Sequence, residues 1–511
     1  MFEPADLNSG QARPTATNRQ DVQRQSAAAS AALLIGSGLS SVAVEIGATI
    51  VLARLLMPED FGLLAMASVF LAMVNKLQGF GFSTATVQRE TLDEATLTRL
   101  FWINGLINLA VTTLIVMAAP LLAAFYGEPR LRLVVWVLAA AWFIGSLASI
   151  HDGLIRRSFR FGTVTLVAGV STLVATAAAV AAAWLGAGYW ALVLQIGLKQ
   201  VVQAVGLFAL AGWCPGGPRR AQGAAESDTA VQQMLGHGGN VSASNVIAYF
   251  GRNLDFILVG AIAGAGQLGL YHKAYRLAAL PFQQIYLPTM NVALAKFSRQ
   301  QRQPEQYRAS LRRAILALSG LIVPLMAYAA VEAEPLILLL GEQWQPAVPL
   351  FRLLLIGTFC NGLLLILKWM YQSEGRTRSL LRWTLVSSPV MAAGIAVGSI
   401  WGVTGIAVGF DIATALLVPP AYVVFCRGSV LRERDFVSPL IPSLLAAGVG
   451  AAATAAAIAA IEPGGTALRL PVGVTIMFAS YAAAFALLPG GRGRVADLWQ
   501  LAKPLWKRRA T

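Results

Sequence analysis

Charged residues are scarce in this chain. Asp, Glu, Lys and Arg make up 12% of its 511 residues, whereas hydrophobic residues make up 57%, and the mean hydropathy is +0.64. Soluble domains carry about 25% charged residues, and disordered chains combine high charge with few apolar residues. The composition therefore excludes both classes and predicts an integral membrane protein.

Residues that carry redox, metal and acid–base chemistry are also few. The three cysteines lie far apart without CxxC spacing, which gives no disulfide framework or zinc site. The three histidines, His151 among them, are too scattered for a catalytic triad or a metal site, and we expect each to be interfacial or solvated. The sequence contains no GxxxxGKS/T phosphate-binding loop. We therefore expect no enzyme activity, no cofactor and no metal.

Long apolar runs are what the chain has instead. A helix needs roughly 20 apolar residues to cross a hydrocarbon core of about 30 Å, and such runs recur from Ala31 to Leu488. They are continuously apolar rather than alternating, which favours helices over a β-barrel. We predict an all-α polytopic membrane protein with about fourteen transmembrane helices. The expected spans are 31–53, 61–85, 100–125, 133–150, 163–185, 188–212, 238–263, 269–295, 311–331, 350–371, 380–400, 403–426, 437–461 and 468–488.

An internal repeat organises these spans. The segment "IVLARLLMPEDFGLLAMAS" from Ile50 matches "ILVGAIAGAGQLGLYHKAY" from Ile257 at an offset of 207 residues, so that Gly62 falls on Gly269. Parallel repeats related by an axis along the membrane normal are a transporter design, and chance similarity of apolar segments is the alternative. We expect two parallel six-helix bundles, plus two C-terminal helices, around a central cavity.

The expected division of the chain follows from this repeat and from its polar segments. Residues 1–30 are polar and lack the apolar core of a cleavable signal. The parts are a disordered cytoplasmic tail (1–30), an N-terminal six-helix lobe (31–212), a cytoplasmic linker (213–237), a C-terminal six-helix lobe (238–426), two further helices (427–488) and a basic cytoplasmic tail (489–511).

The distribution of Lys and Arg predicts the orientation. Nearly all those outside the spans fall on one side of the membrane, and only Arg54, Arg130, Arg132 and Arg469 fall in the opposite loops. By the positive-inside rule both termini are cytoplasmic. The net charge of +15 thus reflects topology, and no nucleic-acid partner is expected.

Several polar residues interrupt the apolar spans. A charge at mid-bilayer costs about 2.5 to 3.5 kcal/mol, so Glu45, Arg252 and Asp255 must face protein or water. Glu45 lies in a polar stripe on one face of the first span, and Arg252 lies in a similar stripe on the seventh. The two positions are equivalent under the 207 offset. A further stripe, on the third span, contains Asn104 and Asn108. We predict an aqueous cavity. Hydrogen bonding between helices is the alternative for the stripes, and an i,i+3 ion pair is the alternative for Arg252 with Asp255.

Two segments resemble a known family. Residues 252–285, "RNLDFILVGAIAGAGQLGLYHKAYRLAALPFQQI", resemble the signature region of oligosaccharide flippases in the multidrug/oligosaccharidyl-lipid/polysaccharide (MOP) exporter superfamily. "LARLLMPEDFGLLAMA" (52–67) and "GFGFSTATVQR" (79–89) resemble the matching part of their first half. The likeness extends loosely over residues 31–430, with a departure at Ala295, where many relatives have proline.

This resemblance implies a function and partners. It implies a multi-pass protein of the bacterial inner membrane that flips undecaprenyl-diphosphate-linked oligosaccharide units from the cytoplasmic to the periplasmic leaflet by alternating access. The product would serve exopolysaccharide, O-antigen or capsule biosynthesis. The implied partners are the polyprenyl-diphosphate-linked glycan, the lipid bilayer, and the polymerase and export proteins of a polysaccharide assembly system.

Candidate site residues follow from the chemistry of that substrate. Cationic side chains suit a diphosphate, and amides and tyrosines suit sugars. The substrate-binding candidates are Arg252, Asn253, Asp255, Glu45, Lys76, Tyr249, Tyr271, Lys273, Tyr275, Arg276 and Lys199. The ion-coupling candidates are Glu45, Asp255 and Asp411, with structural pairing as the alternative. We expect Asp411 near the cytoplasmic end of its span. Lys273 and Arg276 are expected toward the outer face, where snorkelling is the alternative.

Two other functions remain open from the sequence. A drug or cation antiporter of the same superfamily would favour an acidic cavity, whereas basic residues outnumber acidic ones within the expected spans. A membrane polysaccharide polymerase or ligase would need a developed outer loop with acid–base residues. The longest outer loop, "EAEPLILLLGEQWQPAVP" (332–349), is instead typical of a short amphipathic connector.

Overall fold

The computed structural model describes residues 46–78, 94–158, 160–217, 253–301, 303–460, 465–489 and 491. These residues form helices, turns and short connections and contain no strand. Ten stretches within them are long and apolar enough to cross a membrane, and one of these, Thr377–Cys426, contains two long helices. The predicted all-α membrane fold is confirmed. The count of fourteen stays a prediction, because the expected spans 31–53 and 238–263 lie mainly outside the described residues.

The helices follow the expected spans along the chain. An apolar helical stretch, Ile46–Leu55, comes first. The next helices are α2 (Pro58–Gln78), α4 (Glu94–Tyr126), α5 (Arg130–Leu147), α6 (Ser149–Arg157), α7 (Phe161–Trp184) and α8 (Tyr189–Ala211). The second half contains α10 (Leu254–Gln300), α11 (Pro304–Val331), α12 (Ala333–Leu338), η2 (Glu342–Ala347), α13 (Val348–Ser373), α14 (Thr377–Gly398), η3 (Ser399–Trp401), α15 (Gly402–Cys426), α16 (Glu433–Ala460) and α17 (Gly465–Leu487).

Helix α10 has two arms that meet at Gly264. The φ of Gly264 is +75°, a conformation that glycine adopts without a Cβ penalty, and it divides the helix into residues 254–263 and 265–300. The hydroxyl of Tyr271 on the second arm donates to Oδ2 of Asp255 on the first (3.1 Å). The two arms therefore run side by side as a hairpin.

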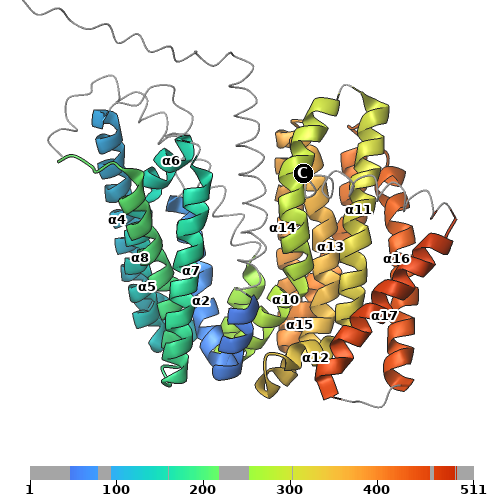
Figure 1. Cartoon of the computed structure of the whole chain (residues 1–511), viewed down its shortest axis with the longest axis horizontal. Helices are drawn as coiled ribbons and strands as arrows, with labels where there is room; N and C mark the ends of the chain where they lie inside the picture. The colour runs from blue at the N-terminus through green and yellow to red at the C-terminus, as the bar shows by residue number, and fades with distance from the viewer. Residues whose placement is uncertain are drawn as a thin grey trace, which may run out of the picture.

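The helices form two groups that meet at one end. Figure 1 shows α2 and α4 to α8 on one side and α10 to α17 on the other, with α2 and α10 together at the lower end. The packing of α2 on α10 is the most extensive contact between the groups. One hydrophobic core runs through both groups there and includes Leu63, Met66, Val259 and Leu268. This contact positions the candidate site.

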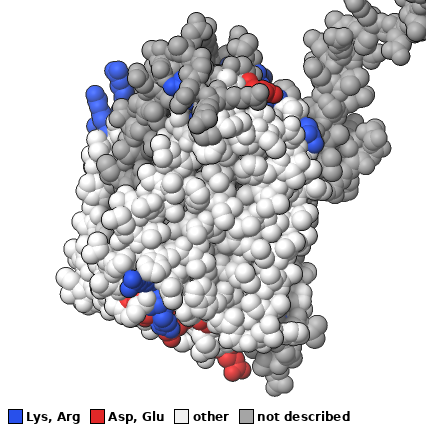
Figure 2. Space-filling model, turned by 90° about the vertical axis from the view of Figure 1, so that its left-hand side faces the viewer, with Lys and Arg blue, Asp and Glu red and all other residues white. Residues whose placement is uncertain are grey.

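The outer surface of the molecule has the pattern of a membrane belt. On the face in Figure 2, charged side chains gather at two opposite ends, with a broad uncharged band between them. Large apolar side chains on α4 are exposed within the span, including Leu114, Met117 and Leu121. An exposed apolar surface of this extent matches a bilayer rather than water. The protein is a multi-pass membrane protein.

The polar stripe on the third span does not line a cavity. Asn104 and Asn108 are buried. The Asn104 amide donates to the Ser146 carbonyl and to Ser149 Oγ, both at 3.1 Å, and the Asn108 amide donates to the Asn104 carbonyl at 2.8 Å. The prediction of a water-facing stripe is wrong here, because both side chains are buried, Asn104 donates to residues of α5 and α6, and Asn108 donates to Asn104.

His151 also differs from the expectation. It is fully buried, and its ring lies against Phe208 (centroids 3.8 Å apart) and Trp213 (5.2 Å). The expectation of an interfacial or solvated histidine is wrong, because aromatic side chains from the end of α8 and the residues after it cover the imidazole.

Candidate functional site

Two glycines form the closest approach of α2 and α10. A methyl group added to Gly62 would lie 1.7 Å from the carbonyl oxygen of Ala265, and one added to Gly269 would lie 1.8 Å from that of Pro58. Pro58 and Ala265, like Gly62 and Gly269, are equivalent under the 207 offset. The contact is therefore reciprocal, which is the arrangement that a two-fold axis produces. The repeated motif meets its own copy.

The loop at 332–349 of the second half closes over this crossing. Trp344 in η2 is fully buried; its Nε1 donates to the Ala53 carbonyl (2.9 Å), and its ring packs edge-on against Phe61 (5.3 Å). Gln343 Nε2 donates to the same carbonyl (2.7 Å). The segment interpreted as a connector thus joins the two halves. We call the following residues the inter-half contact: Ala53, Phe61, Gly62, Gly269 and Trp344.

Lys273 lies inside the inter-half contact. Its side chain is 7% exposed, and its Nζ lies 4.0 Å from the centroid of the Phe61 ring and 5.9 Å from that of Trp344. These are cation–π distances. No ion pair joins Lys273 to a carboxylate among the residues that the structure describes. Snorkelling is excluded for this residue, because its ammonium points into protein.

A stripe on α10 leads from this contact into the space between the halves. Gly269, Lys273 and Arg276 stand at i, i+4 and i+7 and share one helical face, and the first two contact the first half. Arg276 is exposed and lies about 18 Å along the helix from Gly264, at 1.5 Å per residue. The stripe therefore places an exposed cation one turn beyond the buried Lys273.

Buried acidic and aromatic side chains gather on the other side of α10. Asp255 is buried, and its Oδ1 has no hydrogen-bond partner among the described residues. Tyr271, which donates to Oδ2, also lies within electrostatic range of Tyr275 and Asp411. Tyr275 packs edge-on against Phe410 of α15 (5.9 Å). The structure therefore brings together four of the candidate residues: Asp255, Tyr271, Tyr275 and Asp411.

Asp411 does not lie where the sequence predicts. It stands near the middle of α15, whose bounds are Gly402 and Cys426, and it is buried. The prediction that Asp411 lies near the cytoplasmic end of its span is wrong, because α15 continues for several turns beyond it. A methyl group on Gly357 would come within 2.1 Å of Asp411 Oδ1. The carboxylate thus occupies room that a glycine of α13 leaves, and this Oδ1 lacks a hydrogen-bond partner in the described part of the chain.

The structure describes only part of the remaining candidates. Arg252, Tyr249 and Glu45 lie outside the described residues. Lys76 lies on α2, fourteen positions after Gly62 and on the same helical face, but its side chain is not described. Asn253 precedes the first residue of α10, and Lys199 is exposed on α8.

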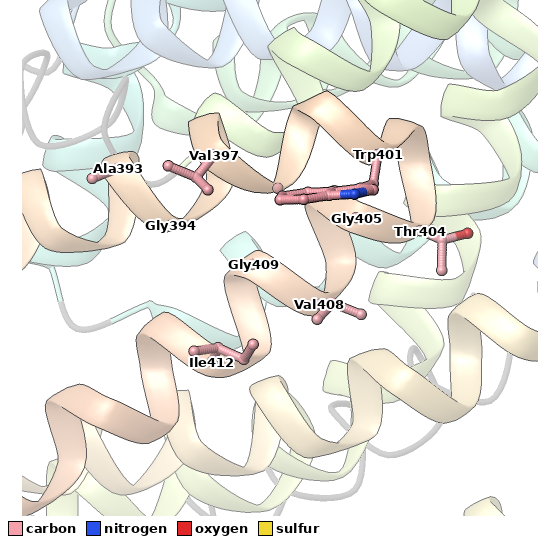
Figure 3. A pocket seen from close by; sticks show the side chains of 10 residues that line it. Ala393, Gly394, Val397, Trp401, Thr404, Gly405, Val408, Gly409 and Ile412 are labelled. Atoms are coloured by element: carbon pink, nitrogen blue, oxygen red, sulfur yellow. The ribbon is translucent and has the colours of Figure 1, made fainter.

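A separate apolar cavity of about 610 Å³ lies between α14 and α15. Figure 3 shows Val397, Trp401, Val408 and Ile412 around it. Its lining residues are small or apolar and none is charged, so it suits hydrocarbon rather than a diphosphate or a sugar. It does not belong to the site on α10.

The chain is similar to proteins named for polysaccharide biosynthesis. It is 26% identical over 422 residues to the succinoglycan biosynthesis transport protein ExoT of Rhizobium meliloti (strain 1021), covering 80% of this chain and 82% of the relative. It is 22% identical over 407 residues to the lipopolysaccharide biosynthesis protein WzxC of Escherichia coli (strain K12), covering 78% and 80%.

Solved structures share the fold. The lipid II flippase MurJ, in an inward closed conformation, matches with a TM-score of 0.69 at 13% identity over 89% of this chain and 98% of that one. An inward-facing multidrug resistance MATE family transporter of the MOP superfamily matches with a TM-score of 0.58 at 16% identity, over 76% and 95%. The fold expected from the resemblance is confirmed.

A family model described as "Polysaccharide biosynthesis protein" matches residues 51–349, more than half of the chain. This range contains Ala53, α2, both arms of α10 and the loop with Trp344, so it includes every residue of the inter-half contact. The chain belongs to this polysaccharide biosynthesis protein family.

Proposed function

We propose that this protein moves a diphosphate-linked oligosaccharide on a polyprenyl lipid from the cytoplasmic to the periplasmic leaflet by alternating access. The observation that carries the proposal is the pairing of a closed contact beside the Gly264 turn of α10 with an exposed Arg276 about 18 Å along the same arm. A carrier in this state has one entrance closed and a hydrated binding chamber behind it. The names of the relatives in polysaccharide biosynthesis and the MurJ-like fold support the same cargo.

The sealed end is the periplasmic one in this proposal. Arginines gather at the ends of helices remote from the inter-half contact, including Arg156, Arg308, Arg376 and Arg427. The positive-inside rule then assigns that side, and both termini, to the cytoplasm of a bacterial cell. The chamber opens to the side on which lipid-linked precursors are assembled.

The sign of the charge favours an anionic cargo over a cationic drug. The side chains directed between the halves on α10 are the cations Lys273 and Arg276, whereas the carboxylates of Asp255 and Asp411 are buried within the second half. A guanidinium and an ammonium suit the oxygens of a diphosphate.

The buried carboxylates have a separate role in this proposal. Asp255 and Asp411 each keep one oxygen without a hydrogen-bond partner among the described residues, which suits exchange with a proton or sodium ion. The membrane potential contributes as well, at about 2.3 kcal/mol per charge for 100 mV. Polymerase and export proteins of the assembly system are the proposed partners after release.

Reconstituted protein tests the proposal directly. Proteoliposomes carrying a fluorescent lipid-diphosphate oligosaccharide should transfer it between leaflets, as measured by an impermeant quencher, and the Arg276→Ala variant should transfer it more slowly. The same lipid with its diphosphate removed is the control substrate. Equal transfer with and without the protein would refute the function.

A further inference from the structure

Lys273 is buried under conditions that do not stabilise a charge. Its ammonium is more than nine-tenths buried and has two aromatic rings as neighbours, with no carboxylate paired to it in the described ranges. Desolvation of an unpaired cation costs more than a cation–π contact recovers. Lys273 therefore destabilises the closed inter-half contact rather than securing it.

Both rings that cover Lys273 are attached to the first half in the closed arrangement. Phe61 belongs to α2 of the first half, and Trp344 is hydrogen-bonded to Ala53 of the same half. Separation of α2 from α10 therefore removes Phe61, the nearer ring, from the ammonium, and separation of the halves also breaks the hydrogen bond that holds Trp344 to the first half, so that water reaches Lys273. Opening relieves the desolvation cost, so the charge favours the open arrangement.

The uncovered ammonium has a second cation beside it. Arg276 stands at i+3 on the same helical face, and residues at this spacing are neighbours on a helix surface. An ammonium and a guanidinium one turn apart can each contact one phosphate of a diphosphate, which binds both through charge-assisted hydrogen bonds. In the closed arrangement Phe61 covers Lys273, whereas Arg276 is exposed.

We propose that Lys273 is a covered anion site, released by opening of the inter-half contact, that completes with Arg276 a binding site for a diphosphate group. This rests on the proposed function for the identity of the cargo. The proposal also predicts which way substrate binding shifts the alternating-access cycle. An anionic group bound at Arg276 favours the opening that exposes Lys273. The head group is thereby both the cargo and the signal for release on the periplasmic side.

Distance measurements across the contact test the proposal. Spin labels at Met57→Cys and Ile262→Cys, both exposed and on opposite halves (59% and 54%), are introduced into full-length protein in which Cys214, Cys360 and Cys426 are replaced by serine. The protein is reconstituted in liposomes. The probe is inorganic pyrophosphate, and sulfate at equal ionic strength is the comparison anion.

In the parent protein, pyrophosphate should increase the population with separated labels and sulfate should not. Lys273→Met keeps a long, unbranched side chain but removes the charge. It should lower the population with separated labels by about tenfold, which corresponds to about 1.4 kcal/mol. It should also abolish the pyrophosphate response, whereas Lys273→Arg should retain it. The matched control is Arg132→Met, because Arg132 lies over Trp136 of its own helix (4.6 Å) and should leave both measurements unchanged.

Two outcomes overturn the inference. One is a Lys273→Met protein with the parent population and pyrophosphate response, and the other is a parent protein that does not respond to pyrophosphate. The lipid transfer assay on the same liposomes separates this failure from failure of the proposed function. Transfer that persists with either outcome rejects only the role of Lys273, whereas absence of transfer in the parent rejects the function.

Discussion

Gly62 and Gly269 are equivalent residues of the two halves, and each lies against the backbone of the other half's helix. The equivalence extends to the atoms that they contact, since the carbonyls of Ala265 and Pro58 are also 207 positions apart in the sequence. A side chain at either position would clash with a backbone carbonyl of the other half. The repeated glycine is therefore a requirement of closure and not of the individual helices.

Alanine at either glycine should open the contact. Gly62→Ala or Gly269→Ala places a methyl group within 2 Å of a carbonyl oxygen, and overpacking of this kind costs about 1 to 3 kcal/mol. Labels at Met57 and Ile262 should report a larger separated population. Gly266→Ala on the same helix is the control, because nothing lies within 4 Å of its added methyl group. An unchanged population with separated labels in both variants would contradict the proposal that the crossing of α2 and α10 closes one entrance.

Trp344→Phe should weaken closure through one hydrogen bond. The substitution keeps an aromatic ring near Phe61 but removes the donor to the Ala53 carbonyl, a loss of about 1 kcal/mol with a further cost for the buried acceptor. The label distances should again shift toward separation. Trp136→Phe loses an equivalent bond to the Val116 carbonyl (3.0 Å) within one half, so it should reduce thermal stability without moving the labels.

Asp255 and Tyr271 should control the response to an ion gradient. Asp255→Asn removes the charge, and we expect transfer without a gradient to persist while stimulation by a proton or sodium gradient is lost. Tyr271→Phe removes the donor to a buried carboxylate, at a cost of about 1 to 3 kcal/mol, and should alter the same stimulation. Tyr422→Phe, which loses a bond to the Leu363 carbonyl (3.1 Å), is the control. Full gradient stimulation in Asp255→Asn would remove this residue from the coupling proposal.

Asp435 should be a stabilising residue without a part in transport. It is 1% exposed, accepts from Arg312 Nε (2.7 Å) and from the backbone of Arg432 (2.9 Å), and joins α11 to α16. Asp435→Asn should reduce stability by about 1.5 to 3 kcal/mol, the range for hydrogen bonds to charged groups. Thermal unfolding in detergent measures the loss. Asp152→Asn breaks the partly exposed i,i+4 pair with Arg156 and should cost no more than about 0.5 kcal/mol.

The sequence carried the parts of the fold that depend on local composition. Apolar runs and the polar segments between them predicted the long helices from α2 to α17. The repeat at Gly62 and Gly269 predicted equivalence of the two positions. It did not predict that they touch, since an offset defines symmetry and not distance.

The sequence did not resolve contacts between distant residues. Trp344 and its acceptor, Ala53, are separated by 291 positions, and nothing in an amphipathic loop identifies its partner. Helical spacing placed Asn104 and Asn108 on one face but did not distinguish a face toward water from a face toward another helix. Lys273 was a candidate as a cation, whereas its cover of aromatic rings comes from the other half and from the loop at 332–349.

Two positions on α10 separate Tyr271, which holds Asp255, from Lys273, which reaches the first half. A helix arm transmits rotation as a rigid rod, so a turn that frees the ammonium also strains the tyrosine bond on its opposite side. With a coupling ion at Asp255, as proposed above, ion occupancy and opening of the inter-half contact would be thermodynamically linked, and each would alter the other by the same factor. The second arm of α10 would then couple the ion that drives transport directly to the lipid-linked substrate, without a chain of other side chains between them.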